Sequence, residues 1–399
     1  MDFRISEEHR RLQLRCRELA ADFATRSAAH DRDASHPTEN YRRLREEGFL
    51  ALNIATQWGG EGVGLLGHTI VFEALGQGCP STALAFNMHA SVVMPVMLSP
   101  EVATEAKRHL ADLVVRQKQL IAGNFSEQGT TSLIGERPLH ARARRVAGGY
   151  SVTGRKRFAS MLEAADYCMV MAYPDGATSP NAGILLLVPR DAPGRRVDPE
   201  WDTLGMRATR SDSLILEECF VPDGAVLFRS DNIRPFRQAH LNWFWGSYTA
   251  VYLGVAQAAY DEIRRVVKAR QPEGYAQPLA YHADVRRHIA VMSADLEAAR
   301  LVTYHSAWLS DSEGPTPETT AALYRAKYVV GEATSRITRT ALTLGGAHGI
   351  FKFSRLEQLF RDGALAPLHP PPSDFCLYAT GLYELDLDPA DLVPPLKPL

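Results

Sequence analysis

Two histidines are the residues of this sequence whose type and surroundings best suit chemistry. His369 stands directly before Pro370-Pro371-Pro372, and this run of prolines predicts a stiff, extended loop. His89 follows Asn87-Met88 in an apolar helical stretch, where most histidines are packed core residues. Because the ordinary pKa of imidazole is close to neutral, either side chain could hold or donate a proton.

Two further segments combine aromatic rings with hydroxyl groups. The segment 124–132 contains Phe125, Ser126 and Ser132, and the segment 149–160 contains Phe158 and Ser160. An apolar wall beside a few hydrogen-bonding groups is typical of a small-molecule pocket. Taken singly, each serine is more often an ordinary turn or strand hydroxyl.

Familiar catalytic and metal-binding motifs do not occur in the sequence. It has no Walker A loop, no HExxH, no GxSxG and no GxGxxG after a predicted strand, so nothing favours a nucleotide-binding protein or a hydrolase. Five cysteines are an odd number without CxxC spacing, which disfavours a disulfide scaffold or a zinc ribbon. We expect buried thiols in a reducing cytoplasm and no metal site. The cysteines are Cys16, Cys79, Cys168, Cys219 and Cys376.

Composition excludes several classes of protein. Hydrophobic residues make up 45% of the 399 residues and charged residues 23%, which excludes a mainly disordered chain. Lys and Arg number 44 against 46 Asp and Glu, so we expect neither nucleic-acid nor membrane binding. We find no apolar run long enough to cross a bilayer, and the charged N-terminus lacks a secretory segment. The expected location is cytoplasmic.

The hydrophobic periodicity divides the chain into three regions. Residues 1–115 have helical spacing, residues 116–230 have short alternating or β-branched runs between turn signals, and residues 231–399 return to long helices. This order predicts an α+β protein with a β domain inserted between helical domains. The clearest expected helices are 83–97, 247–269, 284–310, one from Pro317 to about Gly345, and 374–385; expected strands include 167–172, 183–188 and 213–220.

An ordered series of segments resembles the acyl-CoA dehydrogenase superfamily over nearly the full length. Each segment alone is weak, but their order is specific. The resemblance implies an N-terminal helical domain, a middle β-barrel domain, a C-terminal four-helix bundle, and a homotetramer or dimer with flavin between domains. The segments are 58–62 (WGGEG), 124–132 (NFSEQGTTS), 149–160 (GYSVTGRKRFAS), 204–207 (LGMR), 220–222 (FVP), 344–346 (LGG) and 361–362 (RD).

The resemblance also implies a flavin site. Phe125 and Phe158 would supply ring surface, Ser126 and Ser160 would bond the ring edge, and Ser132 would bond a phosphate or a thioester substrate. At the far end of the cofactor, the implied residues are Arg270, Gly345 and Gly346. The family's pattern around this arginine is otherwise lost, and its glutamine before the glycine pair is Leu342. FAD is the expected cofactor, and FMN or a diffusible reduced flavin stays open.

The catalytic carboxylate of the family is missing from both of its usual positions. Members remove an α-proton from an acyl thioester with a Glu shortly after the Arg-Asp pair or on the first helix of the C-terminal domain. By count these positions are Pro370 and Phe244, which cannot accept a proton.

A monooxygenase branch, typified by dibenzothiophene monooxygenase, also lacks the Glu. It resembles this chain in residues that match His369, His89 and Ser160, and these are the candidate catalytic residues. The resemblance implies oxygen activation through a C4a-hydroperoxyflavin with a separate flavin reductase. Alternatives are an acyl-CoA or acyl-carrier dehydrogenase with a displaced base, such as Asp374, that passes electrons to electron transfer flavoprotein, or a non-catalytic paralogue subunit.

The substrate is a small molecule or an acyl thioester that the sequence does not identify. The resemblance places Trp243, Phe244 and Trp245 at the start of a helix beside the cleft. Such an aromatic wall would favour a bulky or aromatic ligand over a slim acyl chain. Packing into an interface explains these residues equally well.

Overall fold

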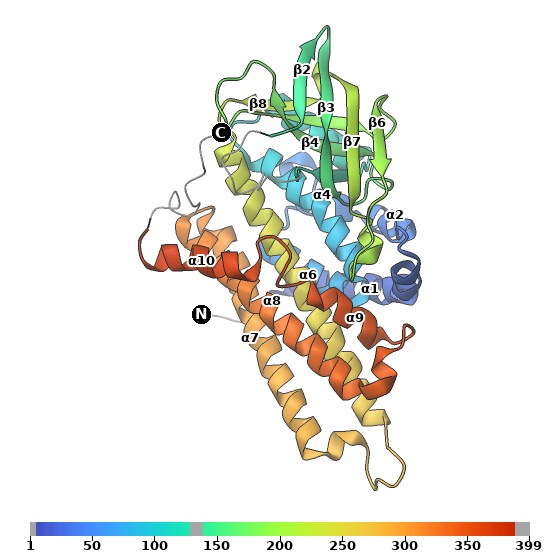
Figure 1. The fold of residues 1–399 in the computed structure, drawn as a ribbon. Coiled ribbons are helices and arrows are strands. Elements are labelled where there is room, and N and C mark those ends of the chain that lie inside the picture. The colour runs from blue at the N-terminus through green and yellow to red at the C-terminus, as the bar shows by residue number, and fades with distance from the viewer. Residues whose placement is uncertain (1–4, 128–138, 388–399) are drawn as a thin grey trace.

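The computed structural model describes residues 5–127 and 139–387 of the chain. Its elements follow the expected order of helices, strands and helices. The sheet lies at one end of the molecule, and the long helices α6 (Arg234–Ala269), α7 (Ala283–Glu313) and α8 (Pro317–Gly345) extend away from it (Figure 1). The α+β class and the three-part fold predicted from the sequence are therefore confirmed.

The N-terminal helices begin where the sequence provides helix-starting signals. The side chain of Ser6 accepts a hydrogen bond from the backbone N–H of His9 at 3.1 Å and caps the first helix. Pro80 occupies the first turn of α4, where its missing N–H costs nothing. The helices are α1 (Glu7–Asp33), α2 (Thr38–Glu46), α3 (Leu65–Gly78), α4 (Pro80–Leu98) and α5 (Thr104–Ala111).

Helix α4 is the one described helix that is long and apolar enough to cross a membrane. Its apolar stretch is 94% buried inside the structure, where it packs against α6 and β1. Polar residues such as Asn87 and His89 interrupt the stretch, so it is not an uninterrupted apolar run, yet its mean composition is apolar enough for a span. The reason is that a helix surrounded by protein needs no polar face, so its composition matches that of a lipid-embedded helix.

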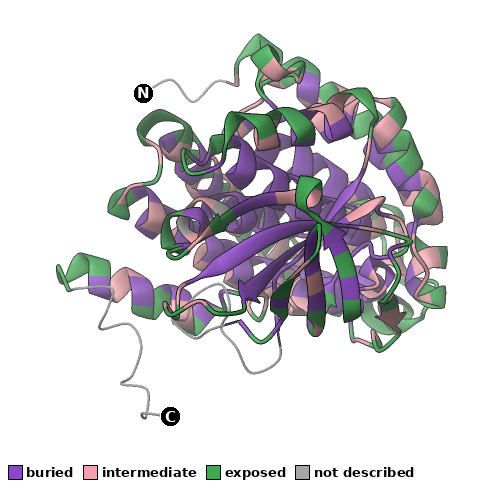
Figure 2. Cartoon of the chain, turned by 90° about the horizontal axis from the view of Figure 1, so that it is seen from above, coloured by how far each residue is buried: buried purple, intermediate pink, exposed green. Residues whose placement is uncertain are grey.

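The middle region forms an eight-stranded mixed sheet within the described residues. Its path runs β6-β7-β3-β2-β4-β5-β8, and β1 pairs in parallel with β4. Seen from above, the strands and inner helices are largely buried and the outer helix faces are exposed (Figure 2). The strands are β1 (Ile121–Asn124), β2 (Arg142–Val146), β3 (Gly149–Ala159), β4 (Tyr167–Pro174), β5 (Gly183–Pro189), β6 (Arg195–Asp198), β7 (Asp212–Pro222) and β8 (Val226–Ser230).

The C-terminal bundle is built around α6, which packs against α3, α4, α7 and α8. A Cβ atom at Gly254 would collide with the carbonyl oxygen of Glu73, so this glycine permits the close approach of α6 to α3. Thr316 and Pro317 start α8 as predicted, with a capping box. The helices are α6 (Arg234–Ala269), α7 (Ala283–Glu313), α8 (Pro317–Gly345), α9 (Arg355–Ala364) and α10 (Ser373–Glu384).

Two expectations for this region need correction. Helix α6 begins at Arg234, well before the expected start near residue 247, because polar and aromatic residues mix in its first turns without a clear apolar period, and packing against α4 then decides the outcome. Trp243, Phe244 and Trp245 therefore lie inside the helix and not at its start.

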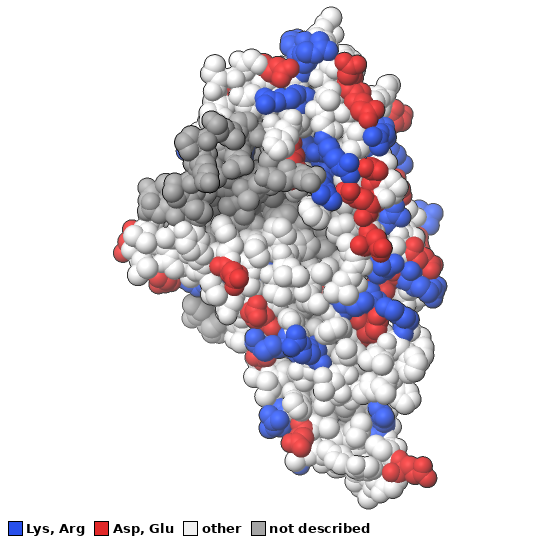
Figure 3. Space-filling view, viewed as in Figure 1, with Lys and Arg blue, Asp and Glu red and all other residues white. Residues whose placement is uncertain are grey.

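On the face in Figure 3, positive and negative side chains are interspersed and no field of one sign forms.

Candidate functional site

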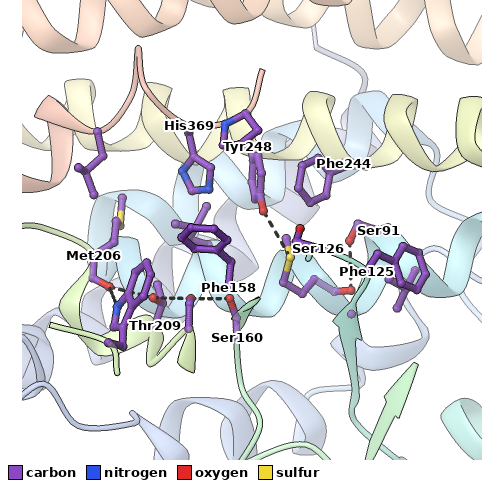
Figure 4. Close-up of a pocket in the computed structure, with 18 of the residues that line it drawn as sticks. Ser91, Phe125, Ser126, Phe158, Ser160, Met206, Thr209, Phe244, Tyr248 and His369 are labelled. Carbon is purple, nitrogen blue, oxygen red and sulfur yellow. Dashed lines mark hydrogen bonds between the residues drawn. The ribbon is translucent and has the colours of Figure 1, made fainter. Parts of the chain in front are cut away.

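A pocket of about 330 Å³ lies where the three regions meet. Helix α4, strands β1 and β3, the turn before β7, helix α6 and the loop between α9 and α10 all contribute to its wall. Figure 4 shows the side chains of Phe244, Tyr248 and His369 projecting from the helical side toward Phe158 and Ser160. The lining residues are Leu84, Met88, Ser91, Val92, Gly123, Phe125, Ser126, Phe158, Ser160, Trp201, Met206, Thr209, Ser211, Phe244, Tyr248, Leu365, Leu368, His369 and Pro370.

A bulge in β3 turns Phe158 toward this pocket. The pairing of β3 with β7 shifts between Lys156 and Ala159, and Phe158 has a φ of 54°. The ring of Phe158 is 62% exposed and meets Trp201 edge to face, with centroids 6.1 Å apart. Positive φ is unfavourable for a bulky residue and clusters at functional sites, so this backbone conformation supports a binding role for the exposed ring.

A buried ion pair fixes the bulged strand against the segment that follows β1. The ammonium of Lys156 bonds Glu127 and donates to the carbonyl oxygen of Met171 at 2.5 Å. Glu127 also accepts the backbone N–H groups of His140 and Ala141 at 2.6 and 3.1 Å. These bonds hold the pKa of Glu127 below its usual value. They join the two segments that contain the candidate serines and phenylalanines.

A second ionic group positions the turn that contains Met206. Arg361 bonds both carboxylate oxygens of Asp31, and the neighbouring Asp362 accepts the backbone N–H of Met206 at 2.6 Å. Burial, reinforced by the charge of Asp31, raises the pKa of Asp362 to about 7. Met206 itself has a φ of 52°. The Arg-Asp pair therefore anchors a strained turn of the pocket wall through α9.

His369 reaches the pocket beside one face of α6. The residues Phe244, Tyr248 and Tyr252 are four apart, so they share that face. The hydroxyl of Tyr252 lies 2.5 Å from Nδ1 of His369, and the ring of Tyr248 lies 4.3 Å from the imidazole. Burial, with a smaller contribution from the charge of Lys327, lowers the pKa of His369 to about 3, so the imidazole is neutral.

The hydrogen-bond partner of His369 suggests which ring nitrogen carries the proton. The contact is compatible with the Tyr252 hydroxyl donating its hydrogen to Nδ1 of His369. In that arrangement Nε2 carries a hydrogen and is a donor. Lys327 supports the same loop, because its buried ammonium donates to the carbonyl oxygen of Ala366 at 2.8 Å.

Both counted positions of the missing carboxylate line the pocket. Phe244 lies on its helical side and Pro370 on its loop, and no described Asp or Glu is among the lining residues. Asp374, the proposed substitute base, is exposed in the first turn of α10 and is not a lining residue.

Comparison with known proteins gives the family. Three family models match consecutive parts of the chain: the acyl-CoA dehydrogenase N-terminal domain over residues 6–112, the middle domain over 123–219 and the C-terminal domain over 236–367. The chain belongs to the acyl-CoA dehydrogenase superfamily of flavin-dependent oxidoreductases.

Relatives of different named activities share this fold. A putative acyl-CoA dehydrogenase, YdbM of Bacillus subtilis, is 27% identical and covers 92% of this chain and 95% of its own. FMN-bound TdsC from Paenibacillus sp. A11-2 superposes with a TM-score of 0.86 at 21% identity, covering 94% of this chain and 97% of its own. A glutaryl-coenzyme A dehydrogenase complex with glutaryl-CoA gives 0.85 at 23% identity and 98% coverage of both chains.

Against this family background, His89 is not in the position expected of a catalyst. It is buried and does not line the pocket. Its Nδ1 accepts the backbone N–H of Ile121 at 3.0 Å, and its Nε2 lies 3.0 Å from the carbonyl oxygen of Leu50. Because backbone groups engage both ring nitrogens, the geometry argues for a structural role that connects α4 to β1.

Other candidate residues divide between the pocket and more distant positions. Ser126, Ser160, Phe125 and Phe158 line the pocket with Phe244. Trp243 instead packs against His68 with centroids 5.5 Å apart, and Trp245 packs against Tyr324 at 4.6 Å. Ser132 lies outside the described residues.

Arg270 lies far from the pocket in its own chain. Its guanidinium donates to the carbonyl oxygen of Gly345 at 3.2 Å, beside Gly346. At a rise of about 1.5 Å per residue, Arg270 is roughly 33 Å along α6 from Tyr248. Arg270, Gly345 and Gly346 are therefore not among the residues that line this pocket.

Several residues that support the lining are not predicted from the sequence. Tyr248 and Tyr252 follow Phe244 at four-residue intervals, and this spacing could have identified them. Thr209 and Ser211 follow the 204–207 segment, but alternating hydroxyls are common at strand starts and gave no distinct signal.

Proposed function

We propose that this protein is a flavin-dependent monooxygenase that uses reduced flavin and oxygen on a bulky or aromatic substrate. The observation that carries the proposal is the pocket wall. Both family base positions face it as Phe244 and Pro370, and His369 supplies the titratable group beside them. Removal of an α-proton requires a base within reach, and the described lining offers no carboxylate.

The residues present fit an isoalloxazine ring. The exposed ring of Phe158 offers a flat apolar surface with the Trp201 indole edge to face beside it, and Ser126 and Ser160 offer hydrogen-bonding groups nearby. When bound in its reduced state, a flavin supplies the electrons that activate oxygen. FAD and FMN both remain compatible with the pocket, whereas the distant Arg270 supports FAD only in a homotetramer or dimer.

His369 would hold a proton at Nε2 toward the pocket. Tyr252 fixes Nδ1 as an acceptor, and burial keeps the imidazole neutral in the free protein. A neutral donor can stabilise a developing negative charge and then regain a proton from solvent. Tyr252 would thus be a positioning residue, while His369, which lines the pocket, would contact the reacting groups.

The substrate side of the pocket supports a bulky apolar ligand. The rings of Phe244 and Tyr248 pack at a tilt with centroids 4.2 Å apart, and Leu84, Met88 and Leu365 complete an apolar wall. One TdsC structure contains FMN together with indole, a flat aromatic molecule. A separate flavin reductase would supply the reduced flavin in this scheme.

Acyl-thioester dehydrogenation is the second candidate. Its support is the similarity to proteins named acyl-CoA dehydrogenases, YdbM among them. It requires Asp374 to move from its exposed position into the pocket, and electron transfer flavoprotein would then be the electron acceptor. The Asp374→Asn variant separates the candidates, because only dehydrogenation needs that carboxylate.

One stopped-flow experiment and one anaerobic titration test the proposal. Mixing the protein with photoreduced FMN and oxygen should give reoxidation through a spectrally distinct species, which Asp374→Asn leaves unchanged and His369→Ala shortens. Anaerobic titration of the oxidised flavoprotein with an acyl-CoA panel should not bleach the flavin. Bleaching that Asp374→Asn abolishes would establish the dehydrogenase instead. Failure to bind flavin in either redox state would indicate a non-catalytic paralogue.

A further inference from the structure

Three hydroxyl groups form a hydrogen-bonded chain along the sheet side of the pocket. Ser160 Oγ lies 2.7 Å from Ser211 Oγ, which lies 2.9 Å from Thr209 Oγ1. Thr209 in turn donates to the carbonyl oxygen of Met206 at 2.9 Å. Figure 4 shows this row of bonds leading from Ser160 at the pocket to Met206. We call Ser160, Ser211 and Thr209 the hydroxyl chain.

The Met206 carbonyl gives the hydroxyl chain a direction. A carbonyl only accepts hydrogen bonds, and each hydroxyl has a single hydrogen. Thr209 uses its hydrogen on Met206, so Ser211 must donate to Thr209 and Ser160 must donate to Ser211. Ser160 therefore has no hydrogen left for the pocket and presents only lone pairs there.

Further hydrogen bonds hold Met206, at which the hydroxyl chain ends. The Met206 N–H donates to Asp362, and the Trp201 indole N–H also donates to the Met206 carbonyl at 3.1 Å. The three hydroxyl-bearing residues are buried, so water has little access to reverse the chain. The surroundings therefore favour the single direction in which Ser160 accepts.

We propose that the hydroxyl chain makes the pocket select reduced over oxidised flavin. This inference rests on the proposed function. Reduction adds N–H groups to the edge of the isoalloxazine ring, where the oxidised ring presents nitrogen lone pairs. Ser160 can accept from such an N–H, but facing a lone pair it must reverse the chain and break the Thr209–Met206 bond. The same preference suits an enzyme that receives its flavin already reduced.

The test measures dissociation constants of photoreduced and oxidised FMN under anaerobic conditions. We expect the native protein to bind reduced FMN at least tenfold more tightly, which raises the midpoint potential of bound FMN by about 30 mV. Thr209→Val should release the chain so that Ser160 can donate. Oxidised FMN should then bind more tightly, reduced FMN should change little, and the ratio should approach one. Ser160→Ala should instead weaken reduced FMN.

Thr203→Val is the matched control. Its hydroxyl also donates to a backbone carbonyl of the same turn, that of Gly205 at 2.9 Å, but Thr203 does not line the pocket. We expect it to preserve the native ratio. Equal binding of both redox states, or a ratio that Thr209→Val leaves unchanged, would overturn the inference while leaving flavin binding intact. Absence of binding in both states would overturn the proposed function as well.

Discussion

His89 and His369 present two environments for the same side chain. Burial lowers the pKa of His89 to about 4 and that of His369 to about 3, so both imidazoles are neutral. The backbone engages both nitrogens of His89. For His369, a tyrosine hydroxyl engages one nitrogen and the ring lines the pocket.

The two histidines have similarly lowered pKa values but different hydrogen-bond partners, so a lowered pKa does not by itself identify a catalytic residue. Burial produces the same shift at either site. What separates the two histidines is whether a ring nitrogen remains for a ligand. His89 has none, because its two bonds replace backbone pairing between α4, β1 and the turn near Leu50.

The largest expected effect is on activity, from His369→Ala. Loss of a positioned proton donor lowers rates by about 10² to 10⁴-fold. We expect a fall in this range in turnover with reduced flavin and oxygen, together with a change in the free energy of unfolding below about 1 kcal/mol, since the ring borders a cavity. Turnover within a few-fold of the native value would remove His369 from the mechanism.

His89→Ala should have the opposite signature. It leaves the buried N–H of Ile121 and carbonyl of Leu50 without partners, each worth roughly 1–3 kcal/mol. We expect a loss of about 2–4 kcal/mol in the free energy of unfolding, measured by urea denaturation, with nearly native activity per folded molecule. A stable but inactive variant would indicate a catalytic role for His89 and contradict the structural role assigned to it.

The pH dependence of the free energy of unfolding tests whether His89 is neutral in the folded protein. In the unfolded chain His89 titrates near pH 6.5, whereas in the folded protein its pKa is about 4. Only the unfolded state takes up the proton between these values, so stability is complete above about pH 7 and falls as the pH drops toward 4. His89→Gln should reduce that slope by up to about 1.4 kcal/mol per pH unit, measured by denaturation at several pH values. An unchanged slope would contradict the neutral assignment.

Tyr252→Phe is expected to have the smallest effect. It removes the hydroxyl that fixes the His369 tautomer but leaves the imidazole in place. We expect turnover to fall about tenfold, the effect of one hydrogen bond of about 1.4 kcal/mol, with an altered pH–rate profile. A purely structural tyrosine would change stability alone and leave that profile as it was.

Much of the fold was predictable because periodicity is a local signal. The α8 start at Thr316-Pro317 and the strands β4 and β5 follow from adjacent residues. The early part of α6 was not predictable, since residues 234–246 mix polar and aromatic side chains without a clear helical period. The two domain boundaries predicted from periodicity, after residues 115 and 230, remain predictions.

The candidate site was predictable only in part. Counting from the Arg-Asp pair placed Pro370 and His369 at the pocket, because a short loop limits where the chain can go. The expected substrate wall grouped Phe244 with Trp243 and Trp245, which instead pack against His68 and Tyr324. Adjacent helical residues differ by about 100° in direction, and only packing decides which one faces a ligand.

The amino-acid sequence is sufficient to establish which chemical groups are present. The two positions where the family usually has a catalytic carboxylate are Phe244 and Pro370. Only the tertiary structure decided which groups are free to act. Both nitrogens of His89 are occupied by backbone partners more than 30 positions away in sequence, whereas His369 turns toward the pocket. A hydrogen bond depends on distance and direction in space, and neither is contained in the order of residues along the chain.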